Sequence, residues 1–160
     1  MRVPTAADDK YSRGVLGFAT GSVTYPGAAV LGISAALATG IGMIRYAGDE
    51  SVADLVIARY PEVVKEPGRV SAWVVGSGMV SSDDESMMLA RAALSEGLPS
   101  VVDAGAIAVL PVHHRTVATP HAGELATALG VDRSVITEDP AAMALRAAIQ
   151  WDATVVLKGS

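Results

Sequence analysis

The residues best suited to chemistry lie in short, small-residue loops, each directly after an apolar run that is typical of a buried strand. These loops are Gly21-Ser22, Gly76-Ser77-Gly78, Asp103-Ala104-Gly105, Thr119-Pro120-His121-Ala122-Gly123-Glu124 and Lys158-Gly159-Ser160. Glycine lets a ligand approach the backbone closely, and free amides at the N-termini of the following helices attract phosphate. The loops therefore predict a binding site for a phosphorylated small molecule.

Each loop taken singly also has an ordinary structural explanation. A Gly-X-Gly after a strand is commonly a tight turn, and His121 or Asp103 can simply cap a following helix. Lys158 can be a solvated lysine, and His113 and His114 lack the spacing of metal ligands. Walker A, dinucleotide-binding Gly-X-Gly-X-X-Gly and Gly-X-Ser-X-Gly patterns are all missing from the sequence, which removes three common enzyme classes.

The elements that must position these loops are alternating strands and helices. Strands are predicted at 15–19, 43–46, 72–75, 100–103, 116–118 and 154–157, and helices at 26–39, 52–59, 122–129 and 140–150. The acidic cluster at 81–85 predicts the cap of a further helix that ends near Gly97. Strands separated by helices indicate parallel βαβ crossovers, so we expect an α/β fold with three α/β/α layers and a mostly parallel sheet. Ligands of such sheets bind at the carboxyl ends of the strands, where the loops above converge.

Composition limits the classes of function. The chain has 160 residues, of which 51% are hydrophobic and 18% charged, with a net charge of −5 and no cysteine. These values predict a single domain over residues 1–160, located in the cytoplasm, without a nucleic-acid surface, a disulfide framework or a thiolate metal site. The uncharged stretch from Val15 to Ile44 is rich in glycine, so it predicts a strand, a loop and a small-residue helix rather than a membrane span.

Together and in this order, the motifs resemble those of the ADP- or ATP-dependent NAD(P)H-hydrate dehydratases, a family of the ribokinase-like superfamily. Gly76-Ser77-Gly78-Met79 stands where the family has Gly-Pro-Gly-Leu, and the histidine loop at 119–124 is among the most specific matches. The other matching segments are Lys10–Gly14, Gly21-Ser22, Tyr25–Leu31, Ala36–Met43, Val101–Ala106 and Val155–Gly159.

This resemblance implies the repair of hydrated NADH or NADPH (NADHX or NADPHX) through phosphorylation of the ring hydroxyl and loss of phosphate. By resemblance, Ala28, Gly78 and His121 would contact the hydrated dinucleotide. Lys158, Gly159 and Ser160 would begin the loop that binds the phosphates of ADP or ATP. Magnesium is expected with the nucleotide, and Asp103, near the phosphate path, is a candidate to assist it. We expect no resident metal site.

The sequence also departs from the family pattern. The later Gly-Thr-Gly-Asp motif, which carries the anion hole and the catalytic aspartate, has no counterpart before Ser160. The resemblance therefore predicts a ribokinase-like fold that is incomplete at its C-terminus, with the catalytic aspartate beyond Ser160 and no activity for this stretch alone. The complete protein is expected to form a homo-oligomer. Two alternatives stay open, a ribokinase-like kinase of vitamin precursors and a non-catalytic binding remnant.

Overall fold

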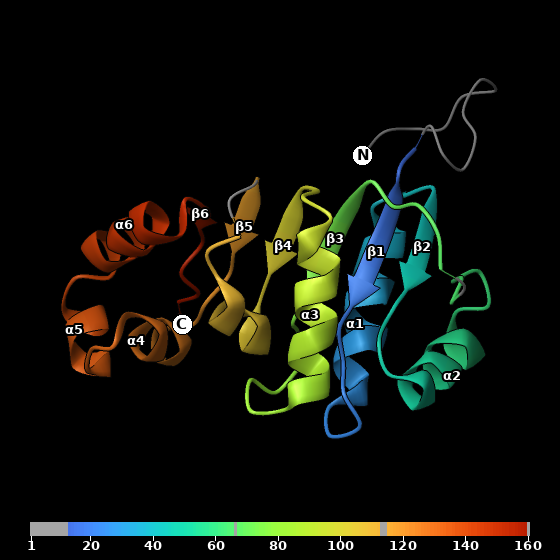
Figure 1. Cartoon of the computed structure of the whole chain (residues 1–160), viewed down its shortest axis with the longest axis horizontal. Helices are drawn as coiled ribbons and strands as arrows, with labels where there is room; N and C mark the ends of the chain where they lie inside the picture. The colour runs from blue at the N-terminus through green and yellow to red at the C-terminus, as the bar shows by residue number, and fades with distance from the viewer. Residues whose placement is uncertain (1–12, 66, 113–114, 160) are drawn as a thin grey trace.

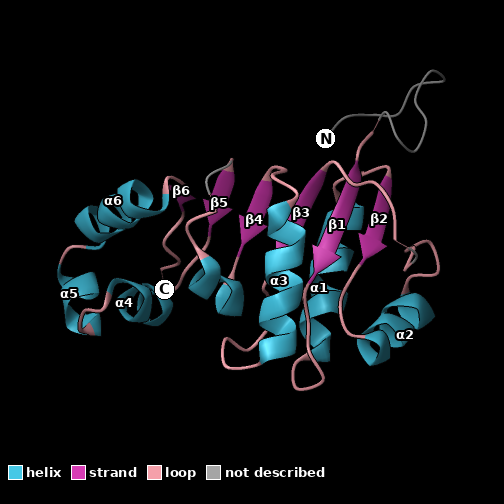
Figure 2. Cartoon of the chain, viewed as in Figure 1, coloured by secondary structure: helices cyan, strands magenta, loops and turns pink. Residues whose placement is uncertain are grey.

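The computed structural model describes residues 13–65, 67–112 and 115–159, which contain a six-stranded sheet with strand order β2-β1-β3-β4-β5-β6 (Figures 1 and 2). Every ladder between neighbouring strands is parallel, which confirms the predicted sheet. The strands are β1 (Val15–Ala19), β2 (Met43–Tyr46), β3 (Ala72–Val75), β4 (Ser100–Val102), β5 (Thr116–Ala118) and β6 (Thr154–Val155).

The helices begin at residues whose side chains suit a helix start. Pro26 and Pro140 occupy first-turn positions, and Asp49, Asp83 and Asp139 accept hydrogen bonds from the first-turn amides of their helices. The helices are α1 (Pro26–Ala38), α2 (Glu50–Arg59), α3 (Asp84–Ser95), a 3₁₀ helix (Ala104–Val109), α4 (Ala122–Leu129), α5 (Arg133–Glu138) and α6 (Pro140–Trp151).

Helices cover the two faces of the sheet unequally. On one face, α1 and α2 bury Phe18 and Ile44 in one apolar core. On the other, α3 and the elements from the 3₁₀ helix to α6 bury Trp73, Val75 and Val102 in a second core. Figure 1 shows α3 in front of the strands and α1 behind them. The sheet is thus the middle of three layers, as predicted.

The face that carries α1 is open over the second half of the sheet. A groove of about 710 Å³ runs across β3, β4 and β5, and Val101 of the central strand β4 is 37% exposed there. In a sheet that helices cover on both faces, the side chain of a valine on a central strand is ordinarily buried, whichever face it points to. Among the described residues, no helix fills this groove.

Two short helices were not expected from the sequence, and a few elements begin or end one or two residues from the predicted bounds. The 3₁₀ helix and α5 were not predicted, because each is a six-residue segment too short to show a helical apolar repeat. The last strand ends at Val155 rather than Leu157. The chain nevertheless stays beside β5, since the amide of Val156 donates to Ala118 O and that of Lys158 to Pro120 O, both at 2.8 Å. Within the described residues, no helix is both long enough and apolar enough to cross a bilayer.

Candidate functional site

The parallel order of the strands brings the predicted site residues to one edge of the sheet. Gly78 follows β3, Asp103 follows β4, His121 follows β5 and Lys158 follows β6, so the four lie at the ends of four neighbouring strands. Ligand-binding residues of open α/β sheets are expected at this edge.

Ala28 and Gly78, the residues expected at the dinucleotide, lie against each other. A Cβ atom on Gly78 would lie 2.5 Å from the Ala28 Cβ, and Gly78 has a φ of +76° that favours glycine. Two hydrogen bonds join the loop that precedes α1, the helix of Ala28, to the loop that carries Gly78. The Gly21 amide donates to Ser77 O at 2.7 Å, and the Ser22 hydroxyl donates to Gly78 O at 2.7 Å. The loops after β1 and β3 therefore form one connected surface.

His121 serves as the N-cap of α4. Its Nδ1 accepts hydrogen bonds from the amides of Gly123 at 3.0 Å and Glu124 at 3.1 Å, while the Glu124 carboxylate accepts from the His121 amide at 2.7 Å. Because Nδ1 must be unprotonated to accept these bonds, the neutral ring carries its proton on Nε2. The imidazole side chain is 58% exposed. Its Nε2 atom lies 3.4 Å from Oε1 of Glu124, so a ligand acceptor at this position would share the Nε2–H donor with that carboxylate.

Asp103 lies between three donors from three other loops. Lys158 Nζ donates to its Oδ1 at 2.7 Å, Thr119 Oγ1 to the same oxygen at 2.9 Å, and Ser77 Oγ to its Oδ2 at 2.9 Å. Burial by itself would raise the pKa of Asp103, but these hydrogen bonds and the charge of Lys158 outweigh it and hold the pKa below the ordinary aspartate value. Asp103 is thus an ionised group that ties together the ends of β3, β4, β5 and β6.

The depressed pKa of Asp103 predicts a dependence of stability on pH. A carboxyl whose folded pKa lies below its unfolded value stabilises the fold above the unfolded pKa, and this contribution disappears as the pH falls through the folded value. We therefore expect the free energy of unfolding to fall more steeply between neutral and acid pH in the wild type than in Asp103→Asn. Denaturant titrations of both proteins at several pH values measure this difference, and parallel curves would contradict it.

Lys158 links the nucleotide loop expected at 158–160 to the histidine loop. Its ammonium lies 2.7 Å from Asp103 and 3.8 Å from the Glu124 carboxylate, and its backbone forms a parallel bridge with His121. Gly159 follows, and a Cβ atom added there would meet no other atom within 4 Å. Ser160, predicted to bind the nucleotide as well, lies outside the described residues.

Two cavities meet at His121. One, of about 660 Å³, lies between α4, α5 and α6 and is also lined by Lys158 and Gly159. The other, of about 450 Å³, extends past Glu124 toward Tyr25 in the loop after β1. The histidine thus separates a space beside the predicted nucleotide loop from a space that leads toward the predicted dinucleotide loops.

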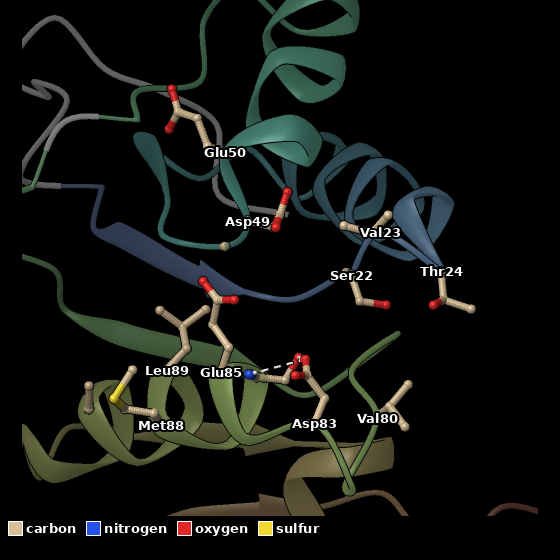
Figure 3. Close-up of a pocket in the computed structure, with 14 residues that line it drawn as sticks. Ser22, Val23, Thr24, Asp49, Glu50, Val80, Asp83, Glu85, Met88 and Leu89 are labelled. Carbon is tan, nitrogen blue, oxygen red and sulfur yellow. Dashed lines mark hydrogen bonds between the residues drawn. The ribbon is translucent and has the colours of Figure 1, made fainter.

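A third cavity, of about 680 Å³, lies near the ends of β1 and β2 and was not predicted as a site. In Figure 3, Asp49 reaches it from one side and Asp83 and Glu85 from the other. Asp49 and Asp83 cap α2 and α3, and hydrogen bonds from Ser51 and Ser86 lower the pKa of their carboxyl groups. Sequence analysis had interpreted the acidic 81–85 segment as a helix cap, and Asp83 confirms that interpretation.

The interactions that sequence analysis missed are those around Asp103 and Lys158. Ser77, Thr119 and Glu124 were recognised as parts of motifs but not as partners of these charged groups. The available signal was their position, since each polar side chain stands within a few residues of a strand end on the same edge.

Comparison with known proteins shows the same relationship along nearly the whole sequence. The family model of NAD(P)H-hydrate dehydratase matches residues 16–160. The chain is 42% identical over 171 residues to the bifunctional NAD(P)H-hydrate repair enzyme Nnr of Mycobacterium tuberculosis, an alignment that covers 99% of this chain and 35% of the relative. It is 31% identical to the ADP-dependent (S)-NAD(P)H-hydrate dehydratase of Xanthomonas campestris, with coverage of 99% and 63%.

A solved structure shares the fold. The ADP/ATP-dependent NAD(P)H-hydrate dehydratase of Bacillus subtilis, co-crystallised with ATP and Mg²⁺, superimposes with a TM-score of 0.84 at 25% identity. The superposition covers 99% of this chain and 62% of the Bacillus protein. The chain therefore spans about a third of the length of the Mycobacterium relative and less than two thirds of the Xanthomonas and Bacillus proteins.

Proposed function

This chain belongs to the NAD(P)H-hydrate dehydratase family, and on that premise we propose that the protein carrying it converts hydrated NADH or NADPH back to the normal cofactor at the expense of ADP or ATP. Hydroxide is a poor leaving group. The ring hydroxyl would lose its proton as it takes the terminal phosphoryl group, which leaves the nucleotide shortened by one phosphate. Phosphate would then depart with the electrons of the C–O bond while the neighbouring ring carbon loses a proton, and the electrons of that C–H bond would form the ring double bond. Such chemistry depends on positioning and charge stabilisation.

The observation that carries this proposal is the order of groups along the sheet edge. Three groups stand at the ends of neighbouring strands. They are Gly78, which packs against Ala28, the Nε2–H donor of His121, and the ammonium of Lys158. Small residues admit a bulky ring, whereas an N–H donor and a cation suit phosphate oxygens. We propose that Ala28, Gly78 and His121 bind the hydrated dinucleotide and that Lys158, Gly159 and Ser160 bind the nucleotide.

We propose that magnesium arrives with the nucleotide. Bound to the phosphates, it would neutralise charge that develops during transfer. Magnesium prefers a few carboxylate oxygens together with substrate phosphates and water. Within the described part of the chain, no three histidine, aspartate or glutamate side chains lie close enough together to hold a metal ion by themselves.

The complete protein is proposed to use this chain as the N-terminal portion of one ribokinase-like domain. The coverage of the Bacillus dehydratase supports this proposal. The cytoplasmic location of the complete protein carrying this chain, and the assembly of that protein into a homo-oligomer, stay predictions.

Two substitutions of His121 separate its roles as a helix cap and as a donor. Asparagine is a good N-cap but lacks the Nε2–H group, whereas alanine lacks both functions. We expect His121→Asn to keep the wild-type free energy of unfolding and to raise KM for the hydrated dinucleotide about tenfold. His121→Ala should show the same rise in KM and lose about 1 kcal/mol of stability. A wild-type KM in His121→Asn would contradict the donor role.

The proposed reaction is tested with the intact protein, hydrated NADH or NADPH, and ADP or ATP. We expect the absorbance of the reduced nicotinamide to return only when a nucleotide is present, with release of one phosphate for each cofactor repaired. Absence of conversion with both nucleotides and both hydrates would refute the proposal. Phosphorylation of a vitamin-precursor alcohol in place of the hydrate would assign the protein to the kinase alternative instead.

A further inference from the structure

Asp103 accepts hydrogen bonds from loops that are far apart in sequence but adjacent at the sheet edge. Ser77 belongs to the loop after β3, Thr119 to the loop after β5 and Lys158 to the chain after β6. Both carboxylate oxygens are engaged, and the side chain is 22% exposed. Two neutral hydroxyl donors thus fix the carboxylate, and one cation faces it.

These partners do not fit a magnesium site at Asp103. Magnesium needs oxygen atoms that direct lone pairs toward it, at near-octahedral geometry. Around Asp103 the two hydroxyl groups donate hydrogen bonds to the carboxylate, and an ammonium already lies 2.7 Å from Oδ1. A divalent cation bound to Oδ1 would have to displace Lys158 or lie against its positive charge.

We infer that Asp103 is a positioning residue that holds the ammonium of Lys158 ready for the phosphates of the nucleotide, and that it is not a magnesium ligand. This inference rests on the proposed function, because it assumes that Lys158 binds the nucleotide. Asp103 itself acts through Lys158 and touches neither substrate.

The physical reason is the flexibility of lysine. Its four-carbon side chain loses much rotamer freedom when it is ordered, and Lys158 is 41% exposed. An ammonium has three N–H donors, of which Asp103 takes one. The Glu124 carboxylate, at 3.8 Å, lies beyond hydrogen-bond distance, so the other two donors stay available for phosphate oxygens. A lysine that is already held in place loses less entropy when the nucleotide binds.

Ser77 is a feature of this chain that supports the arrangement. The family pattern that the sequence resembles has proline at this position, and proline has no hydroxyl to donate. Here the Ser77 hydroxyl lies 2.9 Å from Oδ2, on the side of the carboxylate away from Lys158. It fixes the oxygen that Lys158 does not use.

A double-mutant cycle in the intact protein tests the inference. Nucleotide Kd is measured for the wild type, Asp103→Asn, Lys158→Met and the double variant, both with magnesium and with magnesium chelated. Asparagine keeps the shape of aspartate but lacks its charge. Its single carbonyl oxygen can accept from Thr119 or Ser77, and its NH2 group can donate to the other hydroxyl. We expect Asp103→Asn to weaken nucleotide binding about tenfold in the wild-type background and less than twofold in the Lys158→Met background, with or without magnesium.

Two results would overturn the inference. An equal loss in both backgrounds would show that Asp103 acts independently of Lys158, and a loss that disappears when magnesium is chelated would identify a metal ligand. Asp49→Asn is the matched control, because Asp49 caps α2 beside β2, at the opposite edge of the sheet from β6, and should leave nucleotide Kd unchanged. If Asp103→Asn does not fold, Ser77→Ala removes one donor from the carboxylate and should weaken binding about twofold through the same coupling to Lys158.

A readout without nucleotide distinguishes failure of this inference from failure of the proposed function. Lysines are converted to ¹³C-dimethyl-lysine, and the Lys158 signal is assigned from the Lys158→Met spectrum. We expect Asp103→Asn to shift and narrow that signal while Asp49→Asn leaves it unchanged. An unchanged signal in Asp103→Asn refutes the positioning role, whereas a changed signal in a protein that binds no nucleotide refutes the proposed function alone.

Discussion

Replacing Gly76 with alanine is expected to lower the free energy of unfolding by about 3 to 5 kcal/mol, the sum of backbone strain and overpacking. Gly76 ends β3 with a φ of +107°, a conformation that L side chains rarely adopt. A Cβ atom there would lie 2.0 Å from the backbone oxygen of Asp103 and 2.5 Å from the Ala106 Cβ. A backbone oxygen cannot turn aside as a flexible side chain can, so the ends of β3 and β4 would have to separate.

Gly97→Ala is the control that separates these two contributions. Gly97 also has a positive φ, of +67°, but a Cβ atom there meets nothing within 4 Å. We expect a loss of only about 1 kcal/mol from this backbone strain. Denaturant unfolding of the wild type and both variants measures the difference, and similar losses in the two variants would contradict the close contact at Gly76. Because Gly76 precedes Ser77, we also expect Gly76→Ala to disturb the carboxylate of Asp103.

Lys158→Met is expected to weaken the binding of ADP or ATP by about 10- to 100-fold in the intact protein. Hydrogen bonds between charged groups contribute more than neutral ones, about 1.5 to 3 kcal/mol. Methionine keeps much of the length and apolar character of the lysine stem, so the loss would report the ammonium. Calorimetric titration with each nucleotide gives the Kd.

Lys65→Met tests whether this effect depends on position. Lys65 also pairs with carboxylates, those of Glu50 and Asp54, but it lies near α2 and away from β6. We expect its replacement to leave nucleotide Kd within about twofold of the wild type, as is typical of surface ion pairs that do not contact the ligand. Equal losses in the two variants would indicate a general effect of net charge. An unchanged Kd in Lys158→Met would remove the lysine from the proposed nucleotide site.

The position of the site could be predicted from the sequence because it depends on strand ends. Apolar runs such as 72–75 end at glycine or polar residues, and parallel strands place all such ends on one edge. The residue types selected the loops, and the resemblance to the family then selected Gly78, His121 and Lys158 within them. Their roles at the ligand stay predictions, whereas their common location follows from the sheet.

The contacts between these residues could not be predicted in the same way. Lys158 and Asp103 are 55 positions apart, and Thr119 and Asp103 are 16 positions apart. Their pairing depends on the strand order β3-β4-β5-β6 and on the register between strands, which a single sequence does not specify. The cap formed by His121 was foreseen, but the consequence for its ring proton required the two amide distances.

The strand order also sets the distance between the two proposed binding loops. Neighbouring strands of a sheet are about 4.8 Å apart, so the three spacings from β3 to β6 separate the loop of Gly78 from Lys158 by roughly 14 Å. Two substrates anchored at these loops would therefore have to extend toward each other and meet above β4 and β5, where Asp103 and His121 stand.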